Sequence, residues 1–202
     1  MLLTSAATPA PGLPLPRAFF ARPTQAVALD LLGAYLVHEG PRSRQVARIV
    51  ETEAYVGPHD GASHASRGGT PRTAVMFGPP GHAYVYLVYG MHYLLNVVTE
   101  AEGYPAAVLL RAAEPCEGVD GPTTGPARLC RALDVDLRYN RADLTAPPLY
   151  LAAGERPAGP VVAGPRVGVG YAGGWALKPW RFYLRDSPWV SRRPRARAAA
   201  RG

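Results

Sequence analysis

The stretch Arg48-Ile49-Val50-Glu51-Thr52-Glu53-Ala54-Tyr55 is the part of the chain on which the rest depends. Its β-branched and aromatic residues, followed at once by a Gly-Pro turn, are typical of a β-strand that ends there. Because side chains alternate along a strand, one face carries four of these residues: Ile49, Glu51, Glu53 and Tyr55. A half-buried carboxylate is costly unless it is paired, hydrogen-bonded or used in chemistry. Two solvated glutamates paired with arginines at an exposed strand end are the ordinary alternative, which this stretch alone does not exclude.

Length and composition indicate one soluble domain. The chain has 202 residues, of which 48% are hydrophobic, and is long enough to bury a core. It has no run of about 18 apolar residues, and its start lacks the positive charge of a signal peptide. Cys116 and Cys130 lack metal-ligand spacing. We therefore expect reduced thiols in a cytoplasmic protein.

The net charge of +7 points to a nucleic-acid partner, but much of it lies at one end of the chain. Five arginines follow Ser191 in an Ala/Arg/Pro tail, and removing those five leaves +2 for the rest. Charge alone therefore supports DNA binding weakly. The cationic residues are 21 arginines and one lysine, Lys178. A GC-rich genome explains that ratio equally well.

Turn residues divide the chain into short strands with a few helices between them. We expect a disordered segment at 1–16, a folded domain at 17–191 and a disordered basic tail at 192–202. Helices are predicted at 25–32, with Thr24 as N-cap, and at 126–133, with Pro126 at the first helical position. Strands are predicted at 34–38, 45–55, 83–88, 93–98, 106–111, 149–151, 167–170 and 181–184. This pattern predicts an α+β fold: a single compact domain with a mostly antiparallel curved sheet, a protruding tyrosine-tipped β-hairpin and a few helices.

The predicted hairpin is rich in tyrosine. Tyr84 and Tyr86 share one face of its first strand, and Tyr89 lies at the tip near Met91. An exposed ring at a turn is a poor use of apolar area unless it enters something, and apolar wedges of this kind enter the base stack in minor-groove proteins. The alternative is that Tyr89 folds back onto the domain.

The glycine-rich loop at 57–73 is long for a compact domain, which is usual for functional or disordered loops. Its His59, Asp60 and His64 are too few for a zinc site without a nearby cysteine, so we expect no metal and no other cofactor. A metal-dependent hydrolase that uses the two histidines stays as a minor alternative. Tyr55, Tyr86 and His64 could line a flat slot for a planar ligand with Glu53 at its mouth, although core aromatics are the commoner role for such residues.

Several separate motifs, in the same order along the chain, resemble the alkyladenine (3-methyladenine) DNA glycosylase family. They are 50–58 (VETEAYVGP), 76–77 (MF), 84–91 (YVYLVYGM), 109–112 (LLRA), 124–126 (TGP), 165–169 (PRVGV) and 178–183 (KPWRFY). The resemblance covers about residues 18–191 and leaves out both tails. It identifies 17–191 as a DNA glycosylase domain.

The resemblance implies excision of alkylated or deaminated purines, such as 3-methyladenine, 7-methylguanine, hypoxanthine and ethenoadenine, from double-stranded DNA by a monomer. It implies that Glu53 activates water as general base and that Arg111 helps to hold that water or the carboxylate. Tyr55, Tyr86 and His64 would sandwich the flipped base. Asn96 would exclude the exocyclic amine of normal guanine, and Tyr89, supported by Met91, would fill the gap left in the duplex. One position departs from the family, which usually has asparagine where this chain has Thr73.

Basic residues outside the tail are candidates for contacts with DNA phosphates: Arg72, Arg128, Arg166 and Arg181. Surface solubility or pairing with carboxylates is the alternative for each of them. A strand-cutting glycosylase needs an amine for a Schiff base, and Lys178 is far from Glu53 in sequence. We therefore predict a monofunctional hydrolase that leaves an intact abasic site. The competing class is a non-catalytic module that stacks aromatic rings on nucleic acid.

Overall fold

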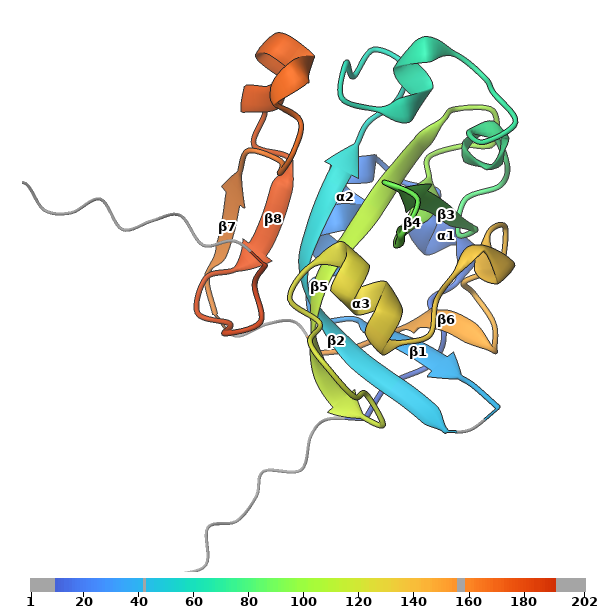
Figure 1. The fold of residues 1–202 in the computed structure, drawn as a ribbon, viewed down its shortest axis with the longest axis vertical. Coiled ribbons are helices and arrows are strands. Elements are labelled where there is room, and N and C mark those ends of the chain that lie inside the picture. The colour runs from blue at the N-terminus through green and yellow to red at the C-terminus, as the bar shows by residue number, and fades with distance from the viewer. Residues whose placement is uncertain (1–9, 42, 156–158, 192–202) are drawn as a thin grey trace, which may run out of the picture.

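The computed structural model describes residues 10–41, 43–155 and 159–191, and strand β2 (Arg44–Tyr55) lies at its centre. One edge of β2 pairs along nearly its whole length with β5 (Ala106–Glu117). The other edge is divided between two partners: β1 (Tyr35–Glu39) pairs with residues 44–48 and β8 (Arg181–Leu184) pairs with residues 51–53. Strand β2 therefore carries its two glutamates at the level where β8 replaces β1 (Figure 1).

The remaining strands extend this sheet in both directions, and every pairing is antiparallel. The main order is β3-β4-β5-β2-β1-β6, while β7 pairs with β8. The added strands are β3 (Ala83–Val88), β4 (His92–Thr99), β6 (Leu149–Ala152) and β7 (Val161–Gly164). The sheet curls around the core, so the predicted α+β class with a curved antiparallel sheet is confirmed (Figure 1).

Short helices cover the sheet. The α-helices are α1 (Arg17–Phe20), α2 (Thr24–Asp30) and α3 (Pro126–Ala132), and the 3-10 helices are η1 (His64–Arg67), η2 (Ala74–Phe77), η3 (Leu137–Tyr139) and η4 (Gly170–Leu177). Thr24 is the first residue of α2 rather than its N-cap, and both its N–H and its hydroxyl donate to Glu100 Oε1. The side chain of Glu100 thus performs the capping that we assigned to Thr24.

Two predictions about the chain's course are wrong. Residues 167–170 are not a strand, because the backbone turns at Gly168 with a φ of 79°, and the strand that pairs with β8 comes earlier, at 161–164. Residues 12–15 are not disordered: the N–H groups of Gly12 and Leu15 donate to Ala153 and Leu151, and Leu15 is buried. Residues 1–9 and 192–202, which hold the rest of the predicted disorder, lie outside the described residues.

The hairpin of β3 and β4 ends in an unusual turn. Tyr89 and Gly90 occupy its central positions with φ of 53° and 69°, and the N–H of Met91 donates to the Val88 carbonyl. Tyr89 is 89% exposed, so it does not fold back onto the domain. The predicted tyrosine-tipped hairpin is therefore present.

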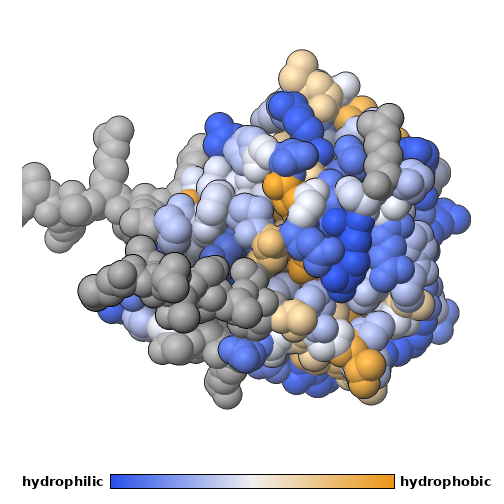
Figure 2. All heavy atoms as spheres, turned by 90° about the horizontal axis from the view of Figure 1, so that it is seen from below, coloured by the Kyte–Doolittle hydropathy of each residue, from blue (hydrophilic) through white to orange (hydrophobic). Residues whose placement is uncertain are grey.

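The surface of the domain is mixed in character. Figure 2 shows apolar side chains in small separate groups among polar ones on the face seen from below. Within residues 10–41, 43–155 and 159–191, no helix has the length and apolar character needed to cross a membrane.

Candidate active site

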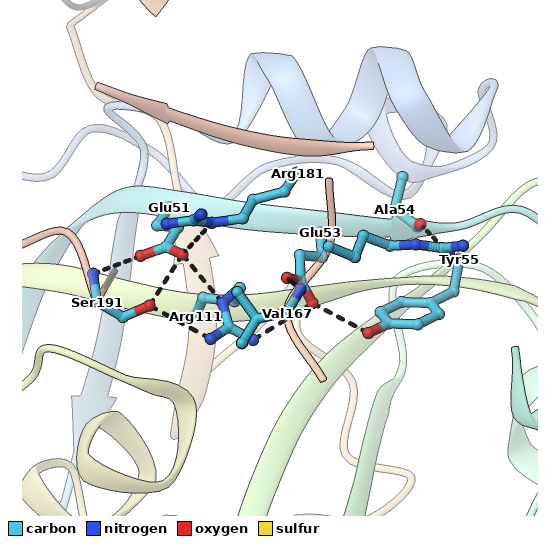
Figure 3. Close-up of polar contacts among 9 residues, drawn as sticks. Glu51, Glu53, Ala54, Tyr55, Arg111, Val167, Arg181 and Ser191 are labelled. Atoms are coloured by element: carbon cyan, nitrogen blue, oxygen red, sulfur yellow. Dashed lines mark hydrogen bonds and ion pairs between the residues drawn. The ribbon is translucent and has the colours of Figure 1, made fainter. Parts of the chain in front are cut away.

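Glu53 lies on β2 with no exposed surface, and its carboxylate accepts three hydrogen bonds (Figure 3). The hydroxyl of Tyr55 donates to Oε2 at 3.0 Å, and Arg111 Nη1 donates to the same oxygen at 3.3 Å. The backbone N–H of Val167 donates to Oε1 at 2.7 Å. Burial raises the pKa of Glu53, while Arg111 and the two other donors oppose that rise. The carboxylate is therefore held by fixed donors rather than by solvent.

Arg111 lies on β5 beside Glu53, at a point where the β2–β5 ladder is irregular. Glu51 pairs with Ala112 and Thr52 with Leu110, so Arg111 falls between two paired positions. Its side chain is only 7% exposed and contacts both carboxylates, Glu51 at 3.0 Å and Glu53 at 3.3 Å. Irregularities of this kind re-aim side chains next to functional sites. The structure thus brings the two predicted catalytic residues together.

A cavity of about 250 Å³ lies next to the donors that hold Glu53, although Glu53 itself is not part of its lining. Three residues that contact the Glu53 carboxylate, Tyr55, Arg111 and Val167, also line this cavity. The predicted base-binding residues are all in its lining: Tyr55, His64, Tyr86 and Asn96. Its volume is close to that of small ligand pockets. The predicted slot is therefore not filled by the protein's own core.

Aromatic rings form one side of this cavity. The rings of His64 and Tyr86 lie edge to face, with centroids 4.7 Å apart, and the Tyr84 ring lies 5.1 Å from that of Tyr86. His64 Nδ1 and the Tyr84 hydroxyl are 2.9 Å apart, which fixes the imidazole. Burial, with smaller contributions from Arg72 and Arg67, lowers the pKa of His64 to about 4. The imidazole is therefore neutral at pH 7.

Asn96 lies on β4, lines the cavity and is nearly fully buried. Its Nδ2 donates to the Tyr84 carbonyl at 3.0 Å across the β3–β4 ladder. This bond uses one amide hydrogen and fixes the orientation of the side chain. A fixed amide of this kind can discriminate between groups on the edge of a planar ligand.

Two of the predicted phosphate contacts are buried and bonded to carboxylates, which contradicts that role. Arg166 has no side-chain exposure and donates to both oxygens of Asp60, at 2.5 and 2.8 Å. Arg181 is 9% exposed at its side chain and donates to Glu51 at 2.7 Å. A buried guanidinium paired in this way cannot reach a phosphate, so we withdraw both predictions.

Arg166 instead contacts residues that surround the cavity. Its guanidinium lies 4.7 Å from the centre of the Tyr55 ring, and it also donates to the Ala54 carbonyl at 2.8 Å. Its partner Asp60 accepts hydrogen bonds from the N–H groups of Val56 and Ala62. The pair thus joins the end of β2 to the loops on either side of the cavity.

The other two predicted phosphate contacts, Arg72 and Arg128, are exposed. Arg72 comes from the loop before η2 and is close enough to influence the pKa of His64. Arg128 lies on α3, where Nη1 donates to the Thr124 hydroxyl at 3.1 Å. Both therefore remain candidates for contacts with phosphates.

His59, Asp60 and His64, which were considered as metal ligands, each contact a different partner. His59 Nδ1 lies 3.3 Å from the Tyr104 hydroxyl, Asp60 is paired with Arg166, and His64 faces Tyr84. Thr73, the position that departs from the family pattern, is buried, and its hydroxyl accepts a hydrogen bond from the Thr70 N–H at 2.9 Å. Its role here is to close the turn at 70–73.

Sequence reasoning assigned no site role to three residues: Glu51, Tyr84 and Val167. Alternation along a strand did indicate that Glu51 shares a face with Glu53, and Tyr84 with Tyr86. Val167 acts through its backbone N–H, which side-chain patterns do not reveal. A larger hollow of about 490 Å³ between α3, β1 and the hairpin includes Met91 but none of the predicted catalytic or base-binding residues.

Comparison with known proteins gives a consistent result. The family model for methylpurine-DNA glycosylase matches residues 18–188. A protein of Anaeromyxobacter dehalogenans strain 2CP-1, named "Putative 3-methyladenine DNA glycosylase", is 58% identical over 188 residues, which are 93% of this chain and 90% of that protein. Proteins of the same name from Myxococcus xanthus and Methanocella arvoryzae are 56% and 53% identical, over 89% of this chain and 94% and 96% of theirs. This chain therefore belongs to the methylpurine-DNA glycosylase family.

Proposed function

We propose that the protein is a DNA glycosylase that excises alkylated or deaminated purines from double-stranded DNA. The observation that carries this proposal is the buried carboxylate of Glu53, held by three donors beside a cavity with aromatic walls. An enzyme that acts on a base must swing it out of the duplex into such a pocket, and damaged bases unstack at lower cost. The names of the relatives support the same activity.

Glu53 acts as general base on the water that attacks the sugar. Cleavage of an N-glycosidic bond passes through an oxocarbenium-like sugar, for which one carboxylate and one water suffice when the base leaves readily. The raised pKa of the Glu53 carboxyl makes its carboxylate a stronger base at neutral pH. Arg111 holds the charged carboxylate in place at 3.3 Å.

The flipped base lies between Tyr55 on one side and His64 with Tyr86 on the other. A cationic base gains roughly 0.5–2 kcal/mol from each good ring contact. Asn96, fixed by its bond to the Tyr84 carbonyl, crowds the exocyclic amine of normal guanine. Tyr89, with Met91 beside it, enters the duplex in place of the extruded base, and Arg72 and Arg128 contact phosphates.

Alkylated bases that already carry a positive charge are the best substrates under this proposal. With a pKa of about 4, His64 is not protonated at pH 7 and does not serve as an acid for a neutral leaving base. Release of 3-methyladenine and 7-methylguanine therefore exceeds that of hypoxanthine and ethenoadenine. The reaction ends at an abasic site, because Lys178, the single lysine, lies over the Trp175 ring and does not line the cavity.

A non-catalytic DNA-binding module is the second candidate, since it accounts for the exposed Tyr89 and the arginines. It gives no role to a carboxylate buried beside the cavity, where it would repel phosphates. The two candidates differ in what Glu53→Gln does.

The test is single-turnover release of 7-methylguanine and hypoxanthine from duplex oligonucleotides, read as strand breaks that appear after alkali. We expect Glu53→Gln to lower the rate by roughly 10²–10⁴-fold, the usual share of a general base, while affinity for the damaged duplex is kept. Glu114→Gln is the matched control, because it also changes a glutamate paired with an arginine between β2 and β5. An unchanged rate in Glu53→Gln, or breaks without alkali, would contradict the proposal.

A further inference from the structure

Glu51 is a second buried acid on β2, and its carboxylate collects donors from three distant segments. Oε1 accepts from Arg111 Nε at 3.0 Å, from Arg181 Nε at 2.7 Å and from the Ser191 hydroxyl at 2.9 Å. Oε2 accepts from the Ser191 N–H at 2.6 Å. A carboxylate with no exposed surface and four donors is fixed in one orientation (Figure 3).

The guanidinium of Arg111 is fixed by the same arrangement. Its Nε donates to Glu51, its Nη1 to Glu53 and its Nη2 to the Ser191 hydroxyl at 3.3 Å. Every nitrogen of the group therefore has a partner, and two of the three partners lie on the side away from Glu53. Rotation of the guanidinium away from Glu53 would break the contacts with Glu51 and Ser191.

Charge balance gives Glu51 a second effect. Two carboxylates, Glu51 and Glu53, share a buried cluster with Arg111, and Arg181 completes it on the far side of Glu51. Without the charge of Glu51, Glu53 would face these guanidinium groups alone. A carboxylate beside uncompensated positive charge binds its proton less tightly and is a weaker base.

We infer that Glu51 is a positioning residue, which together with Ser191 holds Arg111 against Glu53 and keeps Glu53 an effective base. The inference rests on the proposed function, because it assumes that Glu53 accepts a proton from water. It assigns no contact with the substrate to Glu51, because both of its carboxylate oxygens accept from protein donors.

The groups that face Glu53 come from five segments, and each can affect its proton affinity. They are Arg111 on β5, Tyr55 and Glu51 on β2, Tyr86 on β3, the Val167 N–H on the loop after β7, and Arg181, its pairing partner on β8. A change at Glu51 keeps the chemical identity of the others and acts on Arg111 and Arg181 through the contacts that it breaks.

The first arm of the test is the pH profile of single-turnover hypoxanthine release by Glu51→Gln. Glutamine keeps the shape of Glu51 but removes its charge and places an N–H₂ opposite the Ser191 N–H. We expect a rate about 10- to 100-fold lower at neutral pH, by analogy with the loss of residues that orient the ligands of a metal. The acid limb of the profile shifts to lower pH, because the charge of Glu51 raises the pKa of Glu53. Glu114→Gln should show neither change.

The second arm does not depend on activity. Carboxyl ¹³C resonances of glutamate, with that of Glu53 assigned through Glu53→Gln, report its protonation in the wild type and in Glu51→Gln. If the wild type releases no base from any duplex, the proposed function fails, and a lower Glu53 midpoint in Glu51→Gln then supports only the electrostatic part of the inference, that Glu51 raises the proton affinity of Glu53. If the wild type is active and neither the rate nor the Glu53 midpoint moves in Glu51→Gln, the inference is overturned while the proposed function stands.

Ser191→Ala covers the case in which Glu51→Gln does not fold. It removes one hydroxyl, which donates to Glu51 and accepts from Arg111, and leaves all charges in place. We expect a rate several-fold lower with the acid limb unmoved and the melting temperature nearly unchanged. A rate equal to that of the wild type in Ser191→Ala, together with an unfolded Glu51→Gln, would reduce Glu51 to a structural ion pair and overturn the inference.

Discussion

At the scale of single residues, Tyr55 has two different contacts. Its hydroxyl donates to Glu53 at 3.0 Å, and its ring lies 4.7 Å from the guanidinium of Arg166. The hydroxyl favours the charged form of Glu53, whereas the ring serves the cavity wall. A change that removes only the hydroxyl therefore separates the chemistry from the stacking.

We predict that Tyr55→Phe shifts the acid limb of the single-turnover pH profile to higher pH, by roughly one unit. The hydroxyl lowers the pKa of Glu53, so its loss raises that pKa, and the carboxylate is protonated over a wider acidic range. Above this limb the rate should stay within a few-fold of wild type. Tyr150→Phe is the control, because its hydroxyl donates to Glu39, outside the site. A shift to lower pH would contradict the assignment.

We predict that Asp60→Asn lowers the free energy of unfolding by about 3–5 kcal/mol, measured by urea denaturation. The change leaves the charge of Arg166 uncompensated where neither side chain has exposure. Glu117→Gln, which breaks an exposed pair with Arg44, should cost less than about 1 kcal/mol. Similar losses in the two variants would show that burial of the Asp60–Arg166 pair has no special cost.

At the scale of elements, the tip of the β3–β4 hairpin carries a residue that makes its turn less stable than an Asn-Gly turn would be. A positive φ at two successive turn positions favours Asn-Gly, and a tyrosine in that conformation is strained. Tyr89 is strained and 89% exposed, so neither its backbone nor its burial stabilises the domain. Strain of this kind is most often retained at functional sites.

We predict that Tyr89→Asn raises the free energy of unfolding by about 0.5–1 kcal/mol and weakens binding and base release on damaged duplexes. Asparagine adopts the left-handed conformation more readily but offers no ring to the base stack. Arg141→Asn is the control, since Arg141 also has a positive φ and does not line the cavity. Denaturation measures the predicted gain in stability, and single-turnover rates measure the predicted loss of activity. Full activity in Tyr89→Asn would show that Tyr89 does not need to enter the duplex.

Strong local patterns made several elements predictable. Strands at 83–88 and 181–184 are confirmed with the predicted bounds. Tyrosines alternate with valine in the first, and two adjacent aromatic residues, Phe182 and Tyr183, mark the second. The loop at 167–170 was mistaken for a strand, since valines alternate there with glycines whose φ the sequence does not state. The short β7 strand offers only two adjacent valines, Val161 and Val162, as a signal, and it pairs with β8 along its whole length.

The site was predictable to the extent that its chemistry lies in side chains of recognisable motifs. Alternation placed Glu51 and Glu53 together, but not Arg111 between them, because that contact depends on an irregular β2–β5 register. Arg166 and Arg181 are not phosphate contacts because they are buried. The sequence does not show whether an arginine is buried or exposed. Long-range pairing, not local propensity, supplied this information.

At the scale of the whole molecule, positive charge is concentrated after Ser191. We predict that truncation after Arg192, which removes four arginines and keeps Ser191, weakens binding to undamaged duplex. The slope of log affinity against log salt should fall by at most about three to four, since each phosphate contact contributes about 0.9. The maximal single-turnover rate should stay constant, and a large loss of that rate would show that the tail does more than attract DNA.

The late position of β8 and Ser191 in the chain has a consequence for biosynthesis. Both lie against β2, which leaves the ribosome more than a hundred residues earlier. A nascent chain that stops short of them lacks the donors that Arg181 and Ser191 supply to Glu51, and keeps the one from Arg111. Under the proposed function, Arg111 is then held less firmly beside Glu53, so we expect such a chain to release bases more slowly than one that includes Ser191.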